Sequence, residues 1–206
     1  GNGSNLEAIA KACQNNTIPG SIELVISNQP YVKGLERAQK YHLMSQTISH
    51  TDFSSREDFD QTLTERVLSI EPDLVVLAGF MRILTTQFTT AFAGKLINIH
   101  PSLLPEYPGL DTHKQALENG DLMHGATIHY VDEGLDSGPI IAQGALKIDP
   151  SQSEAKLAQR IHKIEHALLP KVIAEIAKEL ISLKGKEVKF ESKSYFGKNN
   201  MEFFNV

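Results

Sequence analysis

An asparagine and a histidine, two residues apart and followed by a proline-rich loop, form the first candidate catalytic group. The run Leu96–His100 is apolar until its last residue and predicts a buried strand. Because residues two apart on a strand point to the same face, Asn98 and His100 project together. Three prolines within the next eight residues stiffen the following loop. An amide donor beside an imidazole favours oxyanion stabilisation and proton transfer, whereas a lone histidine is more often a core residue.

A carboxylate in a glycine-rich turn is the candidate partner of that histidine. Asp136 lies within Gly134–Gly138, where an aspartate by default bonds nearby backbone amides. Close to His100 it would instead fix the tautomer of the imidazole and stabilise an imidazolium, as a proton-transferring pair requires. The residues alone leave both roles open.

The opening segment Gly1–Leu6 begins like a dinucleotide-binding fingerprint but has Leu6 where the third glycine should stand. The next predicted strand ends in Ser27-Asn28, which offers no carboxylate for a ribose hydroxyl, so a nicotinamide cofactor is disfavoured. Glycines and free amides at the start of a helix still favour a bound phosphate. The alternative is a plain turn in which Ser4 or Asn5 caps the helix.

Alternating strand and helix patterns must position these groups. Strands are predicted at residues 22–26, 47–48, 73–79 and 96–100, and helices at 6–13, 33–41, 55–69 and 86–93. The nearly continuous apolar run 73–79 is typical of a parallel strand covered on both faces. This alternation predicts an α/β, Rossmann-like fold with a mostly parallel sheet, helices on both faces, and ligands beyond the carboxyl ends of the strands.

The second half of the chain breaks this pattern. After a short helix at 112–119, strands at 127–131 and 140–148 are close enough to pair as antiparallel neighbours, and helical spacing then continues from 157 to 180 with Pro170 as a kink or a restart. Residues 184–206 form a hairpin or stay loose. We expect a single domain over 1–206, with a phosphate-binding half (1–95), a catalytic half (96–183) and this tail.

The composition excludes several classes of protein. The 206 residues are 41% hydrophobic, and no apolar run approaches the roughly 18 residues that span a bilayer, so we expect no membrane association. The net charge of −5 argues against nucleic-acid binding. The single cysteine, Cys13, excludes a disulfide framework, fits a core position and favours a cytoplasmic protein without a secretory signal. A strand of roughly eight residues is expected before Gly1.

The remaining histidines do not predict a metal site. His113, His124 and His129 lack both the spacing and the acidic partner of a recognised ligand motif, so a metal is disfavoured. His42 and His50 are expected at the surface.

Four blocks of the sequence resemble the folate-dependent phosphoribosylglycinamide formyltransferases of purine biosynthesis. The blocks are Gly1–Leu6, Leu77–Leu84, Asn98–Gly109 continuing to residue 117, and Gly125–Pro139. The resemblance implies a formyltransferase fold with an antiparallel carboxyl-terminal part. It also implies transfer of the formyl group of 10-formyltetrahydrofolate, a co-substrate, to the amine of N1-(5-phospho-D-ribosyl)glycinamide (GAR), with no metal.

The resemblance also implies the residues that bind each substrate. The GAR-binding set is Gly3, Ser4, Asn5, His162, Lys163, Ile164 and Glu165, and the family has a glutamine where His162 stands. The folate-binding set is Arg56, Met81, Arg82, Ile83, Leu84, Asn98, Asp132, Glu133, Gly134, Leu135 and Asp136. Without the resemblance, Arg82 would be a solvated loop charge, and His162 and Glu165 ordinary polar positions on a helix.

The chemistry then predicts a mechanism with Asn98, His100 and Asp136 as catalytic residues. The amine attacks the formyl carbon, Asn98 and protonated His100 donate to the formyl oxygen, and Asp136 assists proton movement through a water. Two alternatives are a formyltetrahydrofolate hydrolase and a non-catalytic folate- or nucleotide-binding protein. The partners expected are small molecules, and the protein is expected to be a monomer or a homodimer.

Overall fold

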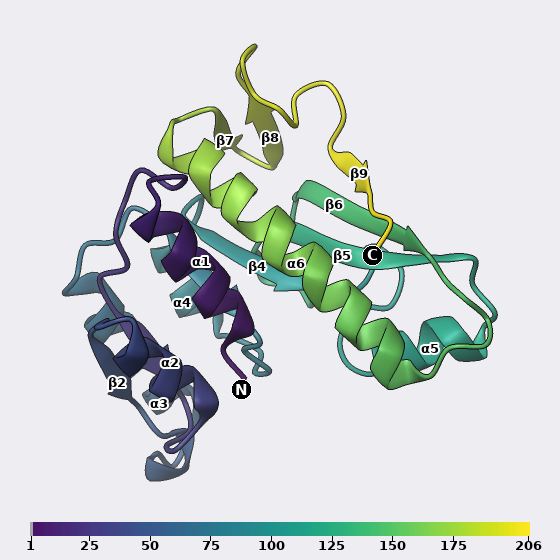
Figure 1. Cartoon of the computed structure of the whole chain (residues 1–206). Helices are drawn as coiled ribbons and strands as arrows, with labels where there is room; N and C mark the ends of the chain where they lie inside the picture. Colours follow the sequence, from purple (N-terminus) through teal and green to yellow (C-terminus); the bar gives the residue numbers. More distant parts are fainter. Residues whose placement is uncertain (1) are drawn as a thin grey trace.

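Strands and helices alternate through the first half of the chain, as the apolar patterns predicted (Figure 1). The computed structural model describes residues 2–206. The first elements are α1 (Ser4–Gln14), β1 (Val25–Ser27), α2 (Lys33–Lys40), β2 (Ser45–Thr47), η1 (His50–Asp52), α3 (Arg56–Leu68), β3 (Val75–Ala78), α4 (Thr86–Ala91) and β4 (Leu96–His100). The Ser55 hydroxyl accepts from the Asp58 amide at 3.0 Å and so caps the start of α3.

Antiparallel pairing begins after β4, also as predicted. The later elements are α5 (Thr112–Glu118), β5 (Met123–Tyr130), β6 (Ile140–Lys147), α6 (Glu154–Ala177), β7 (Ile181–Lys184), β8 (Glu187–Phe190) and β9 (Met201–Phe203). The main sheet has the order β3-β4-β5-β6-β9, in which β5 runs antiparallel to both neighbours and the two outer pairs are parallel. Strands β1 and β2 pair with each other in a separate parallel sheet.

Strand β3 is less buried than the run 73–79 predicted, because its residues are half-buried and Ala78 is exposed. Within residues 2–206, β3 pairs with β4. Its neighbour β4 lies inside the sheet and is buried except at the half-buried Asn98.

The long helix α6 lies across the sheet and carries much of the core (Figure 1). Leu157, Ile161, Ile164 and Leu168 are fully buried at helical spacing. Pro170 lies inside this helix, so the predicted restart does not occur. Helix α1 packs beside α6, which brings the amino-terminal loop next to the middle of the long helix.

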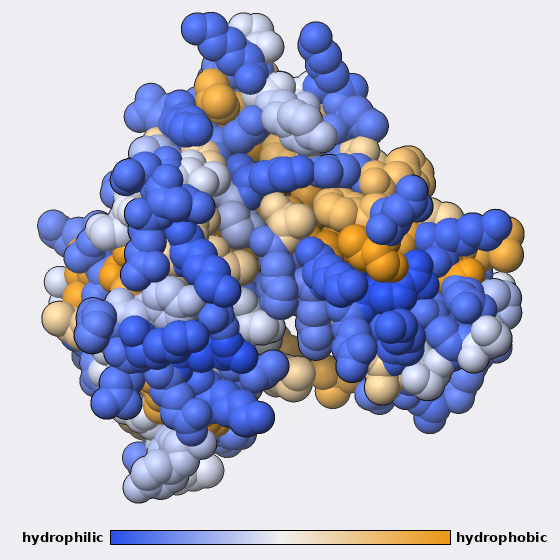
Figure 2. Space-filling model, in the orientation of Figure 1, coloured by the Kyte–Doolittle hydropathy of each residue, from blue (hydrophilic) through white to orange (hydrophobic). Residues whose placement is uncertain are grey.

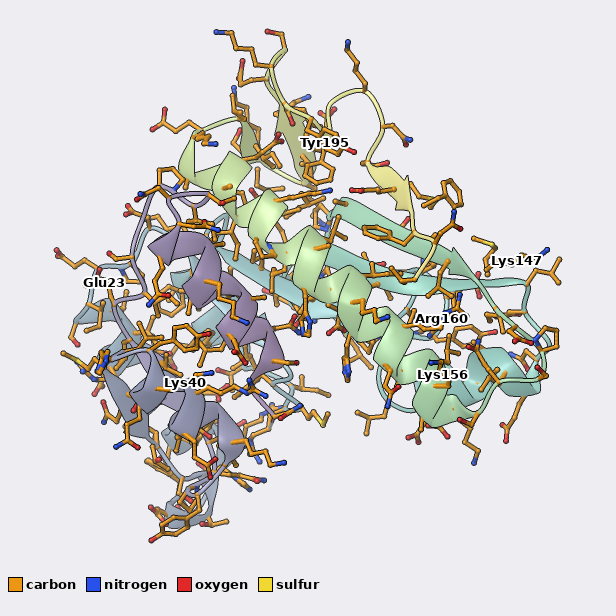
Figure 3. The ribbon with its side chains drawn as sticks, viewed as in Figure 1. Glu23, Lys40, Lys147, Lys156, Arg160 and Tyr195 are labelled. Carbon is orange, nitrogen blue, oxygen red and sulfur yellow. The ribbon has the colours of Figure 1, made fainter. Side chains whose placement is uncertain are left out.

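The tail is ordered against the rest of the chain. The hairpin alternative is confirmed by β7 and β8, and β9 adds to the edge of β6. Arg160, which projects from α6 in Figure 3, donates to the carbonyl oxygens of Val206 at 2.6 Å and Lys147 at 3.0 Å. Figure 2 shows hydrophobic surface where β9 lies, and a mainly hydrophilic surface over α1 and α2. No helix within residues 2–206 is long and apolar enough to cross a membrane.

Candidate active site

Three polar side chains meet at the carboxyl end of β4. The His100 Nδ1 atom lies 3.3 Å from Asp136 Oδ2, and Asn98 Nδ2 donates to Asp136 Oδ1 at 3.4 Å. Both strand residues therefore point to the same side, which confirms the prediction from their spacing. We call Asn98, His100 and Asp136 the catalytic cluster. It can hold an imidazolium beside a carboxylate and present N–H donors to a developing oxyanion.

Asp136 is held in place from several directions. Its Oδ2 atom also accepts from the Gly109 amide at 2.9 Å, and its backbone has a φ of 51°, which L-residues rarely adopt. Burial raises the pKa of this carboxyl, but the hydrogen bonds from His129 and Gly109 and the charges of His100 and His129 outweigh burial, so the pKa is lowered overall. Asp136 is consequently the anionic member of the cluster at neutral pH.

His100 has an acceptor at each ring nitrogen. Its Nε2 atom donates to the carbonyl oxygen of Tyr107 at 2.8 Å, while Nδ1 faces Asp136. The residue is 4% exposed, so water does not replace these partners. The imidazolium, with one N–H on each nitrogen, satisfies both acceptors at once.

A fourth residue of this region, His129, was considered from the sequence only as a metal ligand. Its Nδ1 atom donates to the carbonyl oxygen of Tyr130 at 2.9 Å, and its Nε2 atom lies 3.3 Å from Asn98 Nδ2. His129 Nε2 also lies 3.7 Å from Asp136 Oδ1. Asn98 and His129 are direct partners in the β4–β5 ladder. The antiparallel register, which the fold determines, therefore places this histidine opposite Asn98.

The proline-rich loop after β4 is anchored to β5 and β6. The Thr127 hydroxyl donates to the Ser102 carbonyl at 2.7 Å and accepts from the Leu104 amide at 3.0 Å. Gln143 Nε2 donates to the Leu104 carbonyl at 2.9 Å. These hydrogen bonds are buried or partly buried, and breaking one there would leave a polar group without a partner, at a cost in free energy. They therefore fix the loop whose Tyr107 carbonyl accepts from His100.

The amino-terminal loop opens directly onto α1. Gly3 is the N-cap with a φ of 73°, so Ser4 and Asn5 lie inside the first turn and the alternative of either as the cap is wrong. The first amides of a helix have no intrahelical partner and can bind an anion. A Cβ on Gly3 would lie 2.5 Å from the Gly34 Cα of α2, so this position requires a glycine.

Helix α6 contacts the start of α1 through Glu165. Asn5 Nδ2 donates to Glu165 Oε2 at 2.9 Å, while Asn5 Oδ1 is a buried acceptor without a partner among the described residues. Burial raises the pKa of Glu165, against the opposing effects of the Asn5 hydrogen bond and of His162. His162 and Lys163 are exposed.

Ile164 is placed differently from its neighbours on α6. Its side chain is fully buried, and its Cγ2 atom would lie 2.3 Å from a Cβ on Gly144. The expectation of a substrate contact from this side chain is therefore corrected, because Ile164 faces the sheet and belongs to the core.

The residues expected to bind folate fall into two groups. The first group has apolar side chains that are unusually exposed: Met81 is 80% exposed, Ile83 56% and Leu135 52%. Asp132 closes the turn before Asp136 by accepting from the Gly134 amide at 3.0 Å and the Ser137 hydroxyl at 2.8 Å. Glu133 is exposed, and Leu84 is half-buried.

Two arginines expected at the folate site contact other groups. The Arg82 guanidinium lies 5.3 Å from the centre of the Phe59 ring, so it is not a solvated loop charge. Arg56 begins α3 and lies 3.4 Å from a Glu57 carboxylate oxygen.

The other histidines form contacts of their own. His113 Nδ1 and His124 Nε2 are 3.0 Å apart, and burial is the main cause that lowers the pKa of each to about 4. No cluster of three potential metal-ligating side chains occurs within residues 2–206. His42 is exposed, as expected, whereas His50 is half-buried and bonded to Asn28.

Comparison with known proteins decides the family. The sequence model of the formyl transferase family matches residues 1–173. The chain is 48% identical to phosphoribosylglycinamide formyltransferase of Escherichia coli over 86% of this chain and 84% of that protein. The chain belongs to the phosphoribosylglycinamide formyltransferases.

Other members of the formyltransferase family agree. The enzyme of Bacillus subtilis is 42% identical over 85% of this chain and 90% of its own. The structure of phosphoribosylglycinamide formyltransferase from Coxiella burnetii superposes with a TM-score of 0.91 at 40% identity, covering 98% of this chain and 95% of that one. The predicted fold class and the family resemblance are both confirmed, and the chain is an enzyme of this family.

Proposed function

We propose that this chain transfers the formyl group of 10-formyltetrahydrofolate to the amine of GAR in purine biosynthesis. The observation that carries the proposal is the Asp136 carboxylate, which contacts both Asn98 and His100 at the end of β4. An amide and an imidazole fixed by one carboxylate fit acyl transfer to an amine, in which an oxyanion forms and a proton moves.

The first step is attack of the amine on the formyl carbon. A carbon–nitrogen bond forms, and the electron pair of the carbonyl moves to the formyl oxygen. The N–H groups of Asn98 and His100 then donate to this oxygen instead of to Asp136. Their hydrogen bonds to Asp136 are long, at 3.4 and 3.3 Å, so exchanging them costs little. Each donor of this kind contributes about 10²–10³ in rate.

The second step breaks the bond between the formyl carbon and the folate nitrogen. The attacking nitrogen loses one proton and the departing folate nitrogen gains one, so the net charge of the enzyme is unchanged. His100 Nδ1 gives its proton to the departing folate nitrogen and takes up, through a water, the proton that the attacking nitrogen loses. Asp136, whose pKa is lowered, remains ionised and orients the imidazole during this exchange. The chemistry calls for neither a metal nor a covalent enzyme intermediate.

GAR would bind with its phosphate on the free amides of Gly3, Ser4 and Asn5. The unpartnered Asn5 Oδ1 and the Glu165 carboxylate then face the ribose or the glycinamide as acceptors. The exposed Lys163 adds positive charge in a protein with a net charge of −5, and the neighbouring His162 is also exposed.

The folate would lie on the exposed apolar groups beside the cluster. Met81, Ile83 and Leu135 offer an apolar surface for its ring system. The backbone of Asp132–Asp136 and the amide of Asn98 offer hydrogen bonds, and Arg56 and Arg82 offer positive charge to the glutamate carboxylates. Leu84 and Glu133 complete the set.

A folate absorbance assay with and without GAR tests the proposal. We expect the absorbance change of deformylation only when GAR is present, together with formation of formyl-GAR. Formate release at the same rate without GAR would instead identify a hydrolase. Absence of turnover with both substrates would identify a binding protein.

A further inference from the structure

The backbone at Tyr107 has a conformation that a bulky residue rarely adopts. Its φ is 55°, in the left-handed region, where side chains other than glycine are strained. The carbonyl oxygen of this residue is the acceptor for His100 Nε2 at 2.8 Å. A strained peptide beside the catalytic cluster must be held in place by other contacts.

The side chain of Tyr107 provides those contacts. Its hydroxyl donates to Asp121 Oδ2 at 2.6 Å and accepts from Asn119 Nδ2 at 2.8 Å. The hydrogen bond to Asp121 is the largest cause that raises the pKa of the phenol, so the hydroxyl keeps its proton. The ring also packs against the core cluster that contains Ala116. The phenol thus ties the peptide to the segment between α5 and β5.

The carbonyl of Tyr107 restricts the chemistry of His100. A carbonyl oxygen only accepts, so Nε2 carries a proton in both the neutral and the cationic imidazole. The other nitrogen, Nδ1, faces Asp136 at 3.3 Å. Proton exchange at His100 is therefore confined to Nδ1, the nitrogen on the cluster side.

We propose that Tyr107 is a positioning residue, whose hydroxyl holds its carbonyl against His100 Nε2 and so makes Nδ1 the nitrogen that exchanges the proton. This role rests on the proposed formyl transfer. It deepens that proposal by assigning the proton transfer to one atom and its support to Tyr107, Asp121 and Asn119.

The test is Tyr107→Phe, which keeps the ring and removes the hydroxyl. The matched control is Tyr31→Phe, because Tyr31 is 97% exposed. In protein labelled with ¹⁵N-histidine, NMR at alkaline pH reports the tautomer of neutral His100, with His100→Ala providing the assignment. We expect the Nε2–H form in the parent and the control, and a mixture of both tautomers in Tyr107→Phe. We also expect kcat to fall about fivefold to tenfold, with both KM values within twofold.

A second variant removes the same hydrogen bond from the side of its acceptor, Asp121. Asp121→Ala removes the acceptor of the phenol and should give the same mixture of tautomers and the same loss of kcat. Retention of the pure Nε2–H form in both variants overturns the proposal, whatever happens to turnover, and so does a changed tautomer with an unchanged kcat. If the parent protein transfers no formyl group to GAR, the proposed function fails. The NMR comparison needs no substrate, so it still decides whether the hydrogen bonds of the Tyr107 hydroxyl fix the tautomer of His100.

Discussion

The carboxylate of Asp136 makes polar contacts with β4, β5 and the proline-rich loop. The side chain of Asn5, in contrast, has one hydrogen-bond partner among the described residues, Glu165. The catalytic cluster is thus assembled before substrate arrives, because hydrogen bonds from distant segments fix each group. The amino-terminal loop instead offers backbone amides at the start of α1 and an acceptor without a partner. The proposed function accordingly assigns the chemistry to the first region and the binding of GAR to the second.

The largest expected effect is on the cluster. His100→Ala removes a donor to the developing oxyanion, so turnover should fall about 10²–10³-fold while the protein stays folded. Steady-state formyl transfer and a thermal melt measure the two properties. His42→Ala, at an exposed position, is the control. Near-normal turnover in His100→Ala would remove the cluster from the mechanism.

The next effect concerns the backbone of the amino-terminal loop. Gly3→Ala places a Cβ against Gly34 at a φ of 73°, which forces α1 and α2 apart. We expect a loss of about 2–4 kcal/mol in the free energy of unfolding, measured by urea denaturation, and a raised KM for GAR. Gly20→Ala is the control, because the nearest atom to its added Cβ is 3.9 Å away. Equal stability of the two variants would show that the loop tolerates a side chain.

The buried pair of His113 and His124 should make the stability depend on pH. Burial lowers the pKa of His124 from 6.5 to about 4, so the folded state resists protonation that the unfolded state accepts. The stabilisation is complete above pH 6.5 and is lost as the pH falls towards 4. Relative to His124→Gln, the parent should lose about 3 kcal/mol of unfolding free energy over this range. A difference that stays constant with pH would contradict the burial argument.

A smaller effect is expected for a single contact of the loop. Asn5→Ala removes an acceptor for GAR and the partner of Glu165, so KM for GAR should rise about tenfold with kcat within threefold. Initial rates at varied GAR measure both constants, and Asn15→Ala at the far end of α1 is the control. A fall in kcat alone would assign Asn5 to the chemistry and erase the contrast between the two regions.

Local patterns in the sequence predicted most of this architecture. The helical spacing of α6 and the period of β4 depend on neighbouring residues, so they could be read directly. The shared face of Asn98 and His100 follows from the same period. The degree of burial of β3 and the inward direction of the Ile164 side chain depend on tertiary packing, so local patterns did not predict them.

The rest of the site depends on tertiary register. His129 reaches the cluster because it lies opposite Asn98 in the β4–β5 ladder. Tyr107 reaches His100 because a strained turn brings its carbonyl back to the strand end. Neither contact has a local sequence signal, since each joins segments whose relative placement only the fold determines.

In the proposed function the cluster performs the chemistry and the amino-terminal loop binds GAR. Single-turnover formyl transfer by Asp136→Asn, together with the Kd of GAR for the same variant, separates these two roles. We expect a chemical step at least about 100-fold slower than in the parent, with a Kd within twofold. A normal single-turnover rate, or a slow rate that saturating GAR restores, would contradict it.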